Sequence, residues 1–369
     1  MAAQSGPGPL VVIDSIATGV PEITRKQAES ANRVAKLMKV DQEQHKRISC
    51  IYAKTRIHTR HMAVDPLSAD FDRSLTIRER MNRFLEYAAP LATDVSGRAL
   101  AEAQVQPAEV GMLILVTSTG FIAPGVDVAV MKGLGLSPSA PRAVVNFMGC
   151  AAAMNGLRLA SNFVRGYPGA KALVCCVELS SVNAVWANNI NDTIISSLFA
   201  DGCAAMVVGS TTSAKLVPGK VVIREQFNQF VENSVDGITL GVNCDGITCD
   251  LSAKLPLYIR GGLDPVISKV LARHGMAKSD IDLWAIHPGG PKIIEESIRS
   301  LGVDEQVATK SWEVLAEHGN MLSASLPFVL KRMLAEARLD KPVSSGVAFS
   351  FAPGVTVEGF LFDVVTEEG

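Results

Sequence analysis

The sequence has few of the features that mark secreted, membrane-embedded or nucleic-acid-binding proteins. Of its 369 residues only 5% are aromatic, and 35 Lys and Arg nearly balance 37 Asp and Glu, for a formal net charge of −2. So small a net charge gives no global field to hold nucleic acid or an anionic membrane. No apolar run approaches the roughly 18 residues of a membrane span, and the first residues lack the basic and apolar regions of a secretory signal. We therefore expect a cytoplasmic protein with no membrane span and no nucleic-acid partner.

The cysteines do not form a recognisable framework. There are seven, an odd number, at irregular spacings inside apolar runs, so most are expected to be buried small hydrophobes rather than disulfide partners. The sequence has no C-x-x-C, H-E-x-x-H, G-x-x-x-x-G-K-[ST] or strand-associated G-x-G-x-x-G motif. Zinc, phosphate-loop and dinucleotide chemistry therefore have no support, and we expect no metal and no cofactor.

Hydrophobic patterning indicates a layered α/β protein. Short apolar runs that read as buried strands alternate with stretches of helical character. This alternation favours sheets covered on both faces by helices, and a hydrophobic content of 48% with this length allows two or three compact units. The clearest runs are 112–117, 143–147, 172–177 and 204–209.

The chain resembles itself at an offset of about 170 residues. The turn and strand of 107–120 match those of 278–290, and Gly149-Cys150 matches Gly319-Asn320. The segment 199–202 matches 351–354 in the same order, at a shorter offset that an insertion or deletion in a loop explains. Three matches in one order predict a duplicated α/β unit. The polar, turn-rich stretch 210–219 places the boundary near residue 215, giving halves 1–215 and 216–369.

Cys150 is a candidate nucleophile. An apolar strand ends before it, Gly149 allows a sharp turn, and an Ala-rich, readily helical segment follows. The partial positive charge at a helix N-terminus favours thiolate over thiol and predicts a lowered pKa for this cysteine. The alternative is a buried cysteine that fills space.

His287 and Asn320 are the candidate partners of Cys150. His287 stands where the apolar strand of 282–286 stops at a Pro-Gly-Gly-Pro turn, and Asn320 occupies the position that matches Cys150 in the second half. Taken singly, the histidine could be a satisfied polar residue and the asparagine a helix cap. A duplicated fold, however, brings matching strand ends to one central place. Cys, His and Asn together suit acyl transfer through a thioester, with donors for a developing oxyanion.

These residues stand in motifs that resemble the thiolase fold and, within it, the type III polyketide synthases of the chalcone-synthase-like family. The resemblance covers nearly the whole chain. It implies an α/β, thiolase-like αβαβα layered fold built from two pseudo-symmetric halves, and a homodimer. The motifs are Phe147-Met-Gly-Cys150-Ala-Ala, Ile286-His287-Pro-Gly-Gly-Pro291, His318-Gly-Asn320-Met, Leu198-Phe199-Ala-Asp-Gly202 and Phe349-Ser-Phe-Ala-Pro-Gly-Val-Thr-Val-Glu-Gly359.

The resemblance also implies roles for the three candidates. Cys150 would accept an acyl group from a starter acyl-CoA. His287 and Asn320 would hold the thioester carbonyl of malonyl-CoA and stabilise the enolate left when carbon dioxide departs, because preorganised donors in a dry pocket favour that charge.

Further positions are expected to shape the substrate cavity. Phe199 matches an aromatic gate, although it could be a plain core residue. Cys249 falls where plant enzymes have a second gating Phe, so the smaller side chain should widen the entrance or open a side tunnel. Asn183 matches a cavity-shaping Thr. Pro353 and Gly354, in the C-terminal motif, complete the expected substrate-binding set.

The resemblance places CoA-binding cations at Lys54, Arg47 and Lys292. The first two belong to the basic stretch 45–61, which could instead be a solvated face. A third basic position of the family falls on Cys50, a departure from the pattern.

The departures from plant sequences at Cys249 and around 182–186 predict aliphatic or acetate-type starters, giving alkylpyrones, alkylresorcinols or phloroglucinol-like products rather than chalcones. One alternative is a ketoacyl synthase of fatty-acid initiation, which makes a single condensation and usually has a His-Gln-Ala-Asn context instead of His287-Pro-Gly-Gly-Pro. A hydroxymethylglutaryl-CoA synthase would need a catalytic Glu that the sequence does not place. Another alternative is a non-catalytic thiolase-fold partner protein, against which the three intact residues argue.

Overall fold

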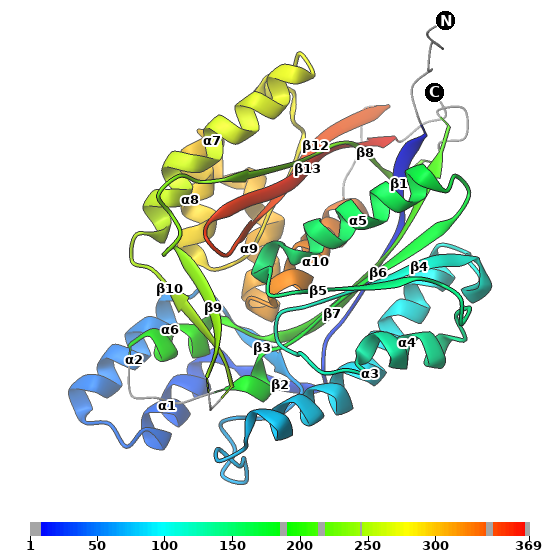
Figure 1. Ribbon diagram of the computed structural model, residues 1–369. Helices are drawn as coiled ribbons and strands as arrows, with labels where there is room; N and C mark the ends of the chain where they lie inside the picture. Colours follow the sequence, from blue (N-terminus) through cyan, green and yellow to red (C-terminus); the bar gives the residue numbers. More distant parts are fainter. Residues whose placement is uncertain (1–8, 185–189, 213–217, 244–245, 337–341, 366–369) are drawn as a thin grey trace, which may run out of the picture.

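The protein folds into five alternating layers of helix and sheet (Figure 1). The computed structural model describes residues 9–184, 190–212, 218–243, 246–336 and 342–365. The predicted boundary near residue 215 lies outside these described residues.

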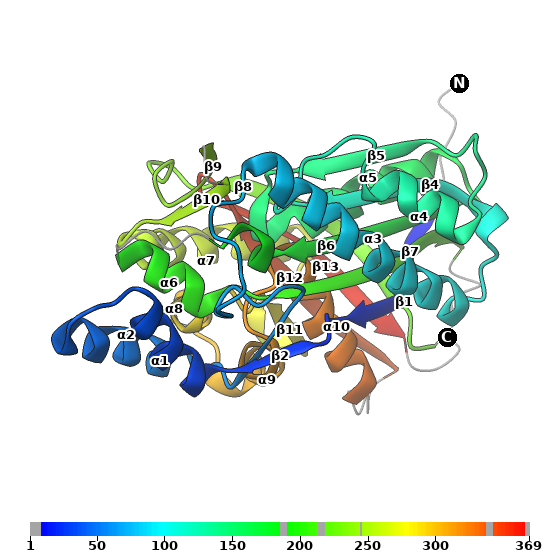
Figure 2. The ribbon, with the colours of Figure 1, turned by 90° about the horizontal axis from the view of Figure 1, so that it is seen from below.

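The first half forms one set of strands with its covering helices, plus a small unit of α1, α2, β2 and β3 that lies with α6 at one end of the molecule (Figure 2). Its elements are β1 (Leu10–Gly19), β2 (Ile23–Lys26), α1 (Gln27–Leu37), α2 (Gln42–Lys54), β3 (Thr59–Met62), α3 (Ile77–Glu102), η1 (Pro107–Glu109), β4 (Val110–Thr117), α4 (Val126–Leu134), β5 (Arg142–Asn146), η2 (Gly149–Ala151), α5 (Ala152–Gly166), β6 (Lys171–Leu179), η3 (Ser180–Asn183), α6 (Ile190–Leu198) and β7 (Asp201–Thr211).

The second half repeats this plan with an added hairpin of β9 and β10. Its elements are β8 (Val221–Phe230), β9 (Ile238–Asn243), β10 (Gly246–Leu251), α7 (Leu255–Arg273), η5 (Lys278–Asp280), β11 (Leu283–Ile286), α8 (Pro291–Leu301), η6 (Glu305–Ala308), α9 (Thr309–His318), η7 (Leu322–Ala324), α10 (Ser325–Glu336), β12 (Val343–Ala352) and β13 (Thr356–Val365).

The two halves have the same strand order. Hydrogen bonds join the large sheet in the order β11-β12-β13-β8-β1-β7-β6-β4-β5, with β1 and β8 antiparallel at the centre. Outward from β1 the order is β7, β6, β4, and outward from β8 it is β13, β12, β11. The pairs β1–β7 and β7–β6 are antiparallel, as are their counterparts β8–β13 and β13–β12, whereas β6–β4 and β12–β11 are parallel. The first half has one more strand, β5, which pairs parallel with β4 at the edge. This repeated topology agrees with the internal resemblance of the sequence.

Alternating side chains of the strands build the layers. In β4, Leu113 and Leu115 pack outward with α3 and α4, whereas Ile114 and Val116 pack inward with α5 and α10. In the second half, outward residues such as Trp284 pack with α7, α8 and α9. Because strand side chains alternate between faces, each sheet is buried on both sides and α5 and α10 share the central layer.

The central layer also fixes the place where the halves meet. The turn η2 precedes α5, and the corresponding turn η7 precedes α10. Gly149 and Gly319 stand at matching positions before these helices with φ of +58° and +73°, a conformation that side chains with a Cβ rarely adopt. The two chain reversals therefore face each other at the centre of the molecule.

Candidate active site

Cys150 lies in the turn η2, between β5 and α5. Phe147 and Gly149 both have positive φ, and the Gly149 N–H donates to Ser118 Oγ at 3.0 Å, which fixes the turn. Burial raises the pKa of the Cys150 thiol to about 12. The expected lowering by the helix terminus is thus wrong in direction, because desolvation of a thiolate at this position outweighs the field of the short turn. The thiol needs a neighbouring base to lose its proton.

Asn320 lies beside this sulfur. Its Nδ2 and Oδ1 atoms are 3.8 Å and 3.9 Å from Cys150 Sγ. Nδ2 donates to Gly289 O at 3.1 Å, and Oδ1 accepts from Leu322 N–H at 2.9 Å. Backbone groups therefore hold the carboxamide from two sides, and the second N–H of Nδ2 is left for the sulfur or for a ligand oxygen.

His287 follows β11 directly, and its backbone N–H donates to Phe349 O. The imidazole is 2% exposed, and neither ring nitrogen has a hydrogen-bond partner within the described part of the chain. Burial lowers its pKa to about 3, so the ring is neutral, with one nitrogen that can donate a hydrogen bond and one that can accept a hydrogen bond or a proton. A Cβ at Gly289 would lie 2.9 Å from His287 Cδ2, and the carbonyl of this glycine accepts from Asn320. The histidine and asparagine turns are thereby joined.

Glu178 is a buried carboxylate at this junction that the sequence did not single out. It accepts from Ser118 N–H at 2.9 Å, from Thr119 Oγ1 at 2.8 Å and, across the halves, from Ser323 Oγ at 2.5 Å. Burial raises its pKa to about 7 despite these donors. One sequence signal could have indicated this residue: Glu178 is an acidic residue at the end of an otherwise apolar strand. In the structure this strand, β6, pairs in parallel with β4, whose own end is polar.

A cavity of about 410 Å³ adjoins these turns. Its lining includes Ser118 and Leu322, which bond to the Cys150 and Asn320 turns, and three residues predicted from sequence: Phe199, Cys249 and Asn183.

Each of the three predicted cavity residues is fixed by its own element. Phe199 follows α6 and forms a β-bridge with Asn320. Cys249 lies on β10, and burial raises the pKa of its thiol. Asn183 donates to Thr119 O at 2.7 Å, and its buried Oδ1 has no partner among the residues that the structure describes.

Pro353 and Gly354 lie in the turn between β12 and β13. A Cβ at Gly149 would lie 3.0 Å from Pro353 Cδ, so the proline packs on the Cys150 turn. Gly354 has φ of +63° and donates its N–H to Ile238 O at 2.9 Å. Pro353 thus contacts the Cys150 turn through its ring, and neither residue belongs to the lining of the cavity.

The predicted CoA-binding cations lie on the surface, away from the cavity lining. Lys54 ends α2 and is exposed. Arg47 pairs with Glu43 at 2.6 Å and Lys292 with Glu295 at 2.8 Å. The structure does not bring these three side chains together with Cys150.

The six cysteines that the structure describes are free thiols. The seventh, Cys244, lies outside the described residues. Within the described ranges, no cluster of His, Cys, Asp and Glu has the size of a metal site, and no helix has the length and hydrophobicity of a membrane span.

Comparison with known proteins assigns the family. The model of the N-terminal domain of chalcone and stilbene synthases matches residues 1–212, and that of the C-terminal domain matches residues 222–366. The alpha-pyrone synthesis polyketide synthase-like Pks18 of Mycobacterium tuberculosis is 58% identical over 98% of this chain and 94% of its own length.

Solved structures agree with this assignment. PKS-I of the brown alga Ectocarpus siliculosus has a TM-score of 0.92 and 38% identity, covering 98% of this chain and all of its own. The 1,3,6,8-tetrahydroxynaphthalene synthase of Streptomyces coelicolor, at 24% identity and a TM-score of 0.88, covers 96% of this chain and all of its own, and supports the fold.

The chain belongs to the chalcone and stilbene synthase family, as the sequence motifs predicted. It is a type III polyketide synthase, an acyltransferase-type enzyme with the thiolase-like fold, and its family acts on CoA thioesters. The ketoacyl synthase and the non-catalytic partner are accordingly not favoured.

Proposed function

We propose that this enzyme holds an acyl starter as a thioester on Cys150, extends it by repeated decarboxylative condensation with malonyl-CoA and releases a cyclised, pyrone-type product. The observation that carries the proposal is the Cys150 sulfur lying 3.8 Å from Asn320 Nδ2, with Asn320 bonded in turn to the His287 turn through Gly289. A nucleophile, a neutral imidazole and an oriented amide donor are the groups that acyl transfer requires.

In the loading step, Cys150 Sγ attacks the thioester carbonyl of the starter acyl-CoA. His287 takes the thiol proton and returns it to the departing CoA sulfur, so CoA leaves as the thiol. The raised pKa of the thiol and the lowered pKa of the imidazole keep both groups neutral at rest, so the proton moves to His287 as the sulfur attacks and not before.

In the extension step, the malonyl carboxylate leaves as carbon dioxide and its bonding electrons pass to the α-carbon. The resulting enolate oxygen accepts hydrogen bonds from Asn320 Nδ2 and the His287 ring. The carbanion then attacks the acyl carbonyl on Cys150 and expels the Cys150 thiolate. The lengthened acyl chain is now attached to CoA. The apolar ring of Phe199 disfavours the malonyl carboxylate and so favours its loss.

We propose aliphatic starters. The cavity beside the site has room for a flexible chain, and Cys249 in its lining is smaller than an aromatic gate would be. The similarity to an alpha-pyrone synthesis enzyme favours alkylpyrones over the alkylresorcinol and phloroglucinol-like alternatives.

Lys54, Arg47 and Lys292 are proposed to meet the CoA phosphates. Since Arg47 and Lys292 are paired with exposed glutamates, they would exchange these partners for phosphate oxygens on binding. We propose no further cofactor, and a reducing cytoplasm as the location, because a nucleophilic thiol among free cysteines must stay reduced.

We also propose that the halves 1–215 and 216–369 form one catalytic unit, because Cys150 comes from the first and His287 and Asn320 from the second.

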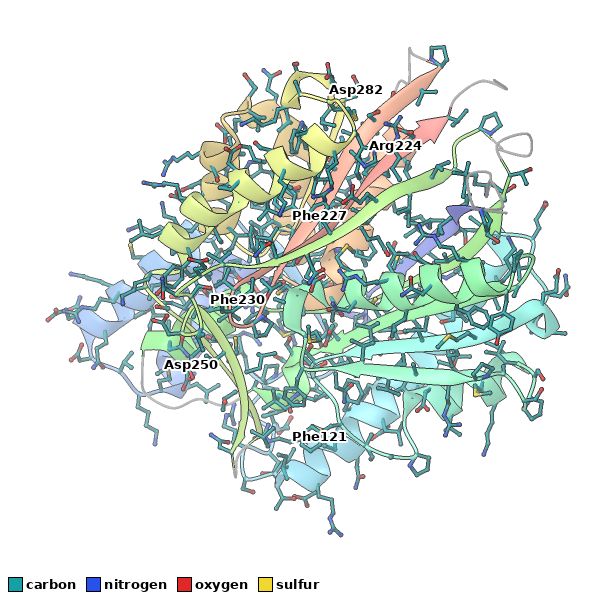
Figure 3. All side chains as sticks on the ribbon, turned by 45° about the horizontal axis from the view of Figure 1, so that its top comes forward. Phe121, Arg224, Phe227, Phe230, Asp250 and Asp282 are labelled. Carbon is teal, nitrogen blue, oxygen red and sulfur yellow. The ribbon has the colours of Figure 1, made fainter. Side chains whose placement is uncertain are left out.

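A second copy of the chain is proposed to cover the free edge of the sheet at β5. Val144 on this strand is 49% exposed. Phe121, labelled in Figure 3 on the connection from β4 to α4, is 37% exposed. Open edges of this kind are usually paired or covered. In sedimentation the wild type should be a dimer, and V144K should dissociate into monomers more readily.

The test is incubation with malonyl-CoA and a panel of aromatic and fatty acyl-CoAs, with products identified by mass spectrometry. We expect pyrones built on aliphatic starters, and none from C150A. Exclusive use of p-coumaroyl-CoA would refute the starter class. If the wild type forms no acyl-enzyme on Cys150 by intact-protein mass spectrometry with any acyl-CoA of the panel, that result would instead support a non-catalytic protein.

A further inference from the structure

Arg60 is a buried cation that the proposed reaction does not use. It lies on β3 and is 2% exposed. No carboxylate lies within ion-pair distance of it in the described part of the chain. Its guanidinium instead donates Nε–H to Gln27 Oε1 at 3.0 Å and Nη1–H to the carbonyls of Phe199, at 2.9 Å, and Ser196. A buried charge that binds backbone carbonyls holds that backbone strongly, because charge-assisted hydrogen bonds are the stronger kind.

These carbonyls belong to the C-terminal end of α6 and the residue after it. The last carbonyls of a helix have no partner within the helix, and they favour a nearby positive charge. Arg60 takes the carbonyl of Ser196, and Gln27 Nε2 donates to that of Ser197 at 2.7 Å. The carbonyl of Leu198 accepts from Asn320 N–H at 2.9 Å. The end of α6 is therefore held by Arg60 and Gln27 on one side and by Asn320 on the other.

The same segment carries Phe199 and pairs with Asn320. Ala200 N–H donates to Asn320 O at 2.9 Å, which completes the bridge between Phe199 and Asn320. Arg60 also packs against the residue before Asn320, since a Cβ at Gly319 would lie 2.9 Å from Arg60 Cγ. The arginine thus touches both strands of the bridge.

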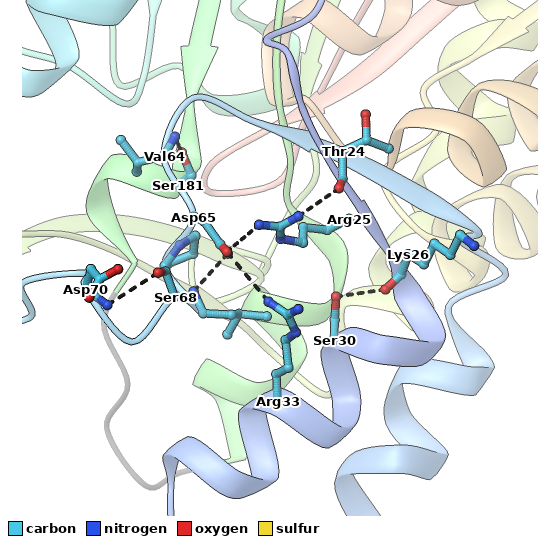
Figure 4. A network of polar contacts seen from close by, with 12 residues as sticks. Thr24, Arg25, Lys26, Ser30, Arg33, Val64, Asp65, Ser68, Asp70 and Ser181 are labelled. Carbon is cyan, nitrogen blue, oxygen red and sulfur yellow. Dashed lines mark hydrogen bonds and ion pairs between the residues drawn. The ribbon is translucent and has the colours of Figure 1, made fainter.

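The base from which Arg60 extends is itself fixed. Directly after β3, Ala63 N–H donates to Asp201 at 2.7 Å, at the start of β7. Asp65 pairs with Arg25 at 2.5 Å and lies 3.7 Å from Arg33 of α1 (Figure 4). These contacts hold β3 between α1 and the large sheet, so the guanidinium has a fixed origin.

We propose that Arg60 is a positioning residue of the condensing site, which holds the bridge between Phe199 and Asn320 and so aims the Asn320 carboxamide at the malonyl thioester oxygen. The inference rests on the role proposed above for Asn320. It predicts that Arg60 matters for decarboxylation and extension, which use Asn320, and far less for acyl loading, which uses Cys150.

Lysine cannot replace this arginine. The planar guanidinium group donates to Gln27 and to the two backbone carbonyls at once, whereas an ammonium group is a compact charge without that geometry. A misplacement of about 1 Å at a reacting group can cost roughly 100-fold in rate. For R60K we therefore expect malonyl-CoA decarboxylation and kcat to fall by about 10- to 100-fold. The rate of Cys150 alkylation and the KM for the starter should stay near the wild-type values.

The experiment compares R60K with R98K. Arg98 also donates to a backbone carbonyl, that of Thr18, but is exposed on α3, so R98K should leave both activities unchanged. Q27L removes the bond to Ser197 and the partner of Arg60 Nε. It should lower decarboxylation in the same direction but less, and it decides the question if R60K does not fold. N320A is measured alongside.

The outcomes separate the two ideas. If N320A leaves decarboxylation unchanged, the proposed role of Asn320 fails. If N320A lowers it but folded R60K and Q27L do not, only the positioning role of Arg60 fails. That role is also overturned if R60K changes only the starter KM, which would make Arg60 a substrate contact, or if loading and decarboxylation fall equally, which would make it a general structural residue.

Discussion

Glu178→Gln should remove a pH-dependent loss of stability. The carboxyl group is fully buried, and burial raises its pKa from an ordinary value near 4.5 to about 7. A carboxyl group whose pKa is higher in the folded state stabilises that state while it is protonated. Its contribution is therefore complete below about pH 4.5, declines as pH rises and is gone above about pH 7.

The size follows from the two pKa values. Each pKa unit corresponds to about 1.4 kcal/mol, so the whole loss is about 3 kcal/mol, of which roughly 2.5 kcal/mol falls between pH 5 and pH 8. The glutamine is neutral throughout and has no such loss. It has one acceptor oxygen where Glu178 has two, so it leaves one of the donors Ser118, Thr119 or Ser323 unpaired, at a constant cost of about 1–3 kcal/mol.

The measurement is urea unfolding at several pH values between 5 and 8, followed by the fluorescence of tryptophans that include the buried Trp284. Relative to wild type, E178Q should become more stable by roughly 2.5 kcal/mol from pH 5 to pH 8. E296Q is the matched control. Glu296 is also buried, but its hydrogen bond to Arg260 lowers its pKa, so its contribution is lost only on acidification below this range.

The reasoning is refuted if the difference between E178Q and wild type is the same at pH 5 and pH 8. Glu178 would then not be forced to ionise inside the fold. A pH-dependent difference for E296Q in this range would likewise show that the assay reports something other than these carboxyl groups.

Further predictions concern the site itself. C150A should form no acyl-enzyme by intact-protein mass spectrometry yet retain malonyl-CoA decarboxylation; surviving acyl transfer would exclude Cys150 as the nucleophile. N320A should lower decarboxylation by about 100- to 1,000-fold, the usual effect of losing one oxyanion donor, with loading comparatively intact. C249F should narrow the cavity and lower the ratio of kcat/KM for long over short acyl-CoAs by about 10-fold. If this ratio is unchanged, the acyl chain of the substrate does not lie beside residue 249. G289A should lower kcat by about 100-fold, because its Cβ would displace the His287 ring, whereas G166A, with open space around it, should not.

The local parts of the site could be predicted from the sequence. A strand, a glycine turn and a helix around Cys150 are set by neighbouring residues, and the same signals stand before Asn320 and at His287. The order of apolar runs and the internal repeat were sufficient for the layered fold, because strand alternation and helix periodicity depend on near neighbours.

The tertiary structure decided what depends on distant residues. Nothing near Cys150 in sequence shows that burial raises the pKa of its thiol, because desolvation is set by everything packed around it. The hydrogen bond from Ser323 to Glu178 and the one from Arg60 to the Phe199 carbonyl each join residues more than a hundred positions apart. The sequence indicated which groups are the candidates for the chemistry, because their residue types and neighbours can be read along the chain. Only the assembled fold set their protonation, their orientation and the shape of the cavity beside them, because these depend on residues distant in sequence.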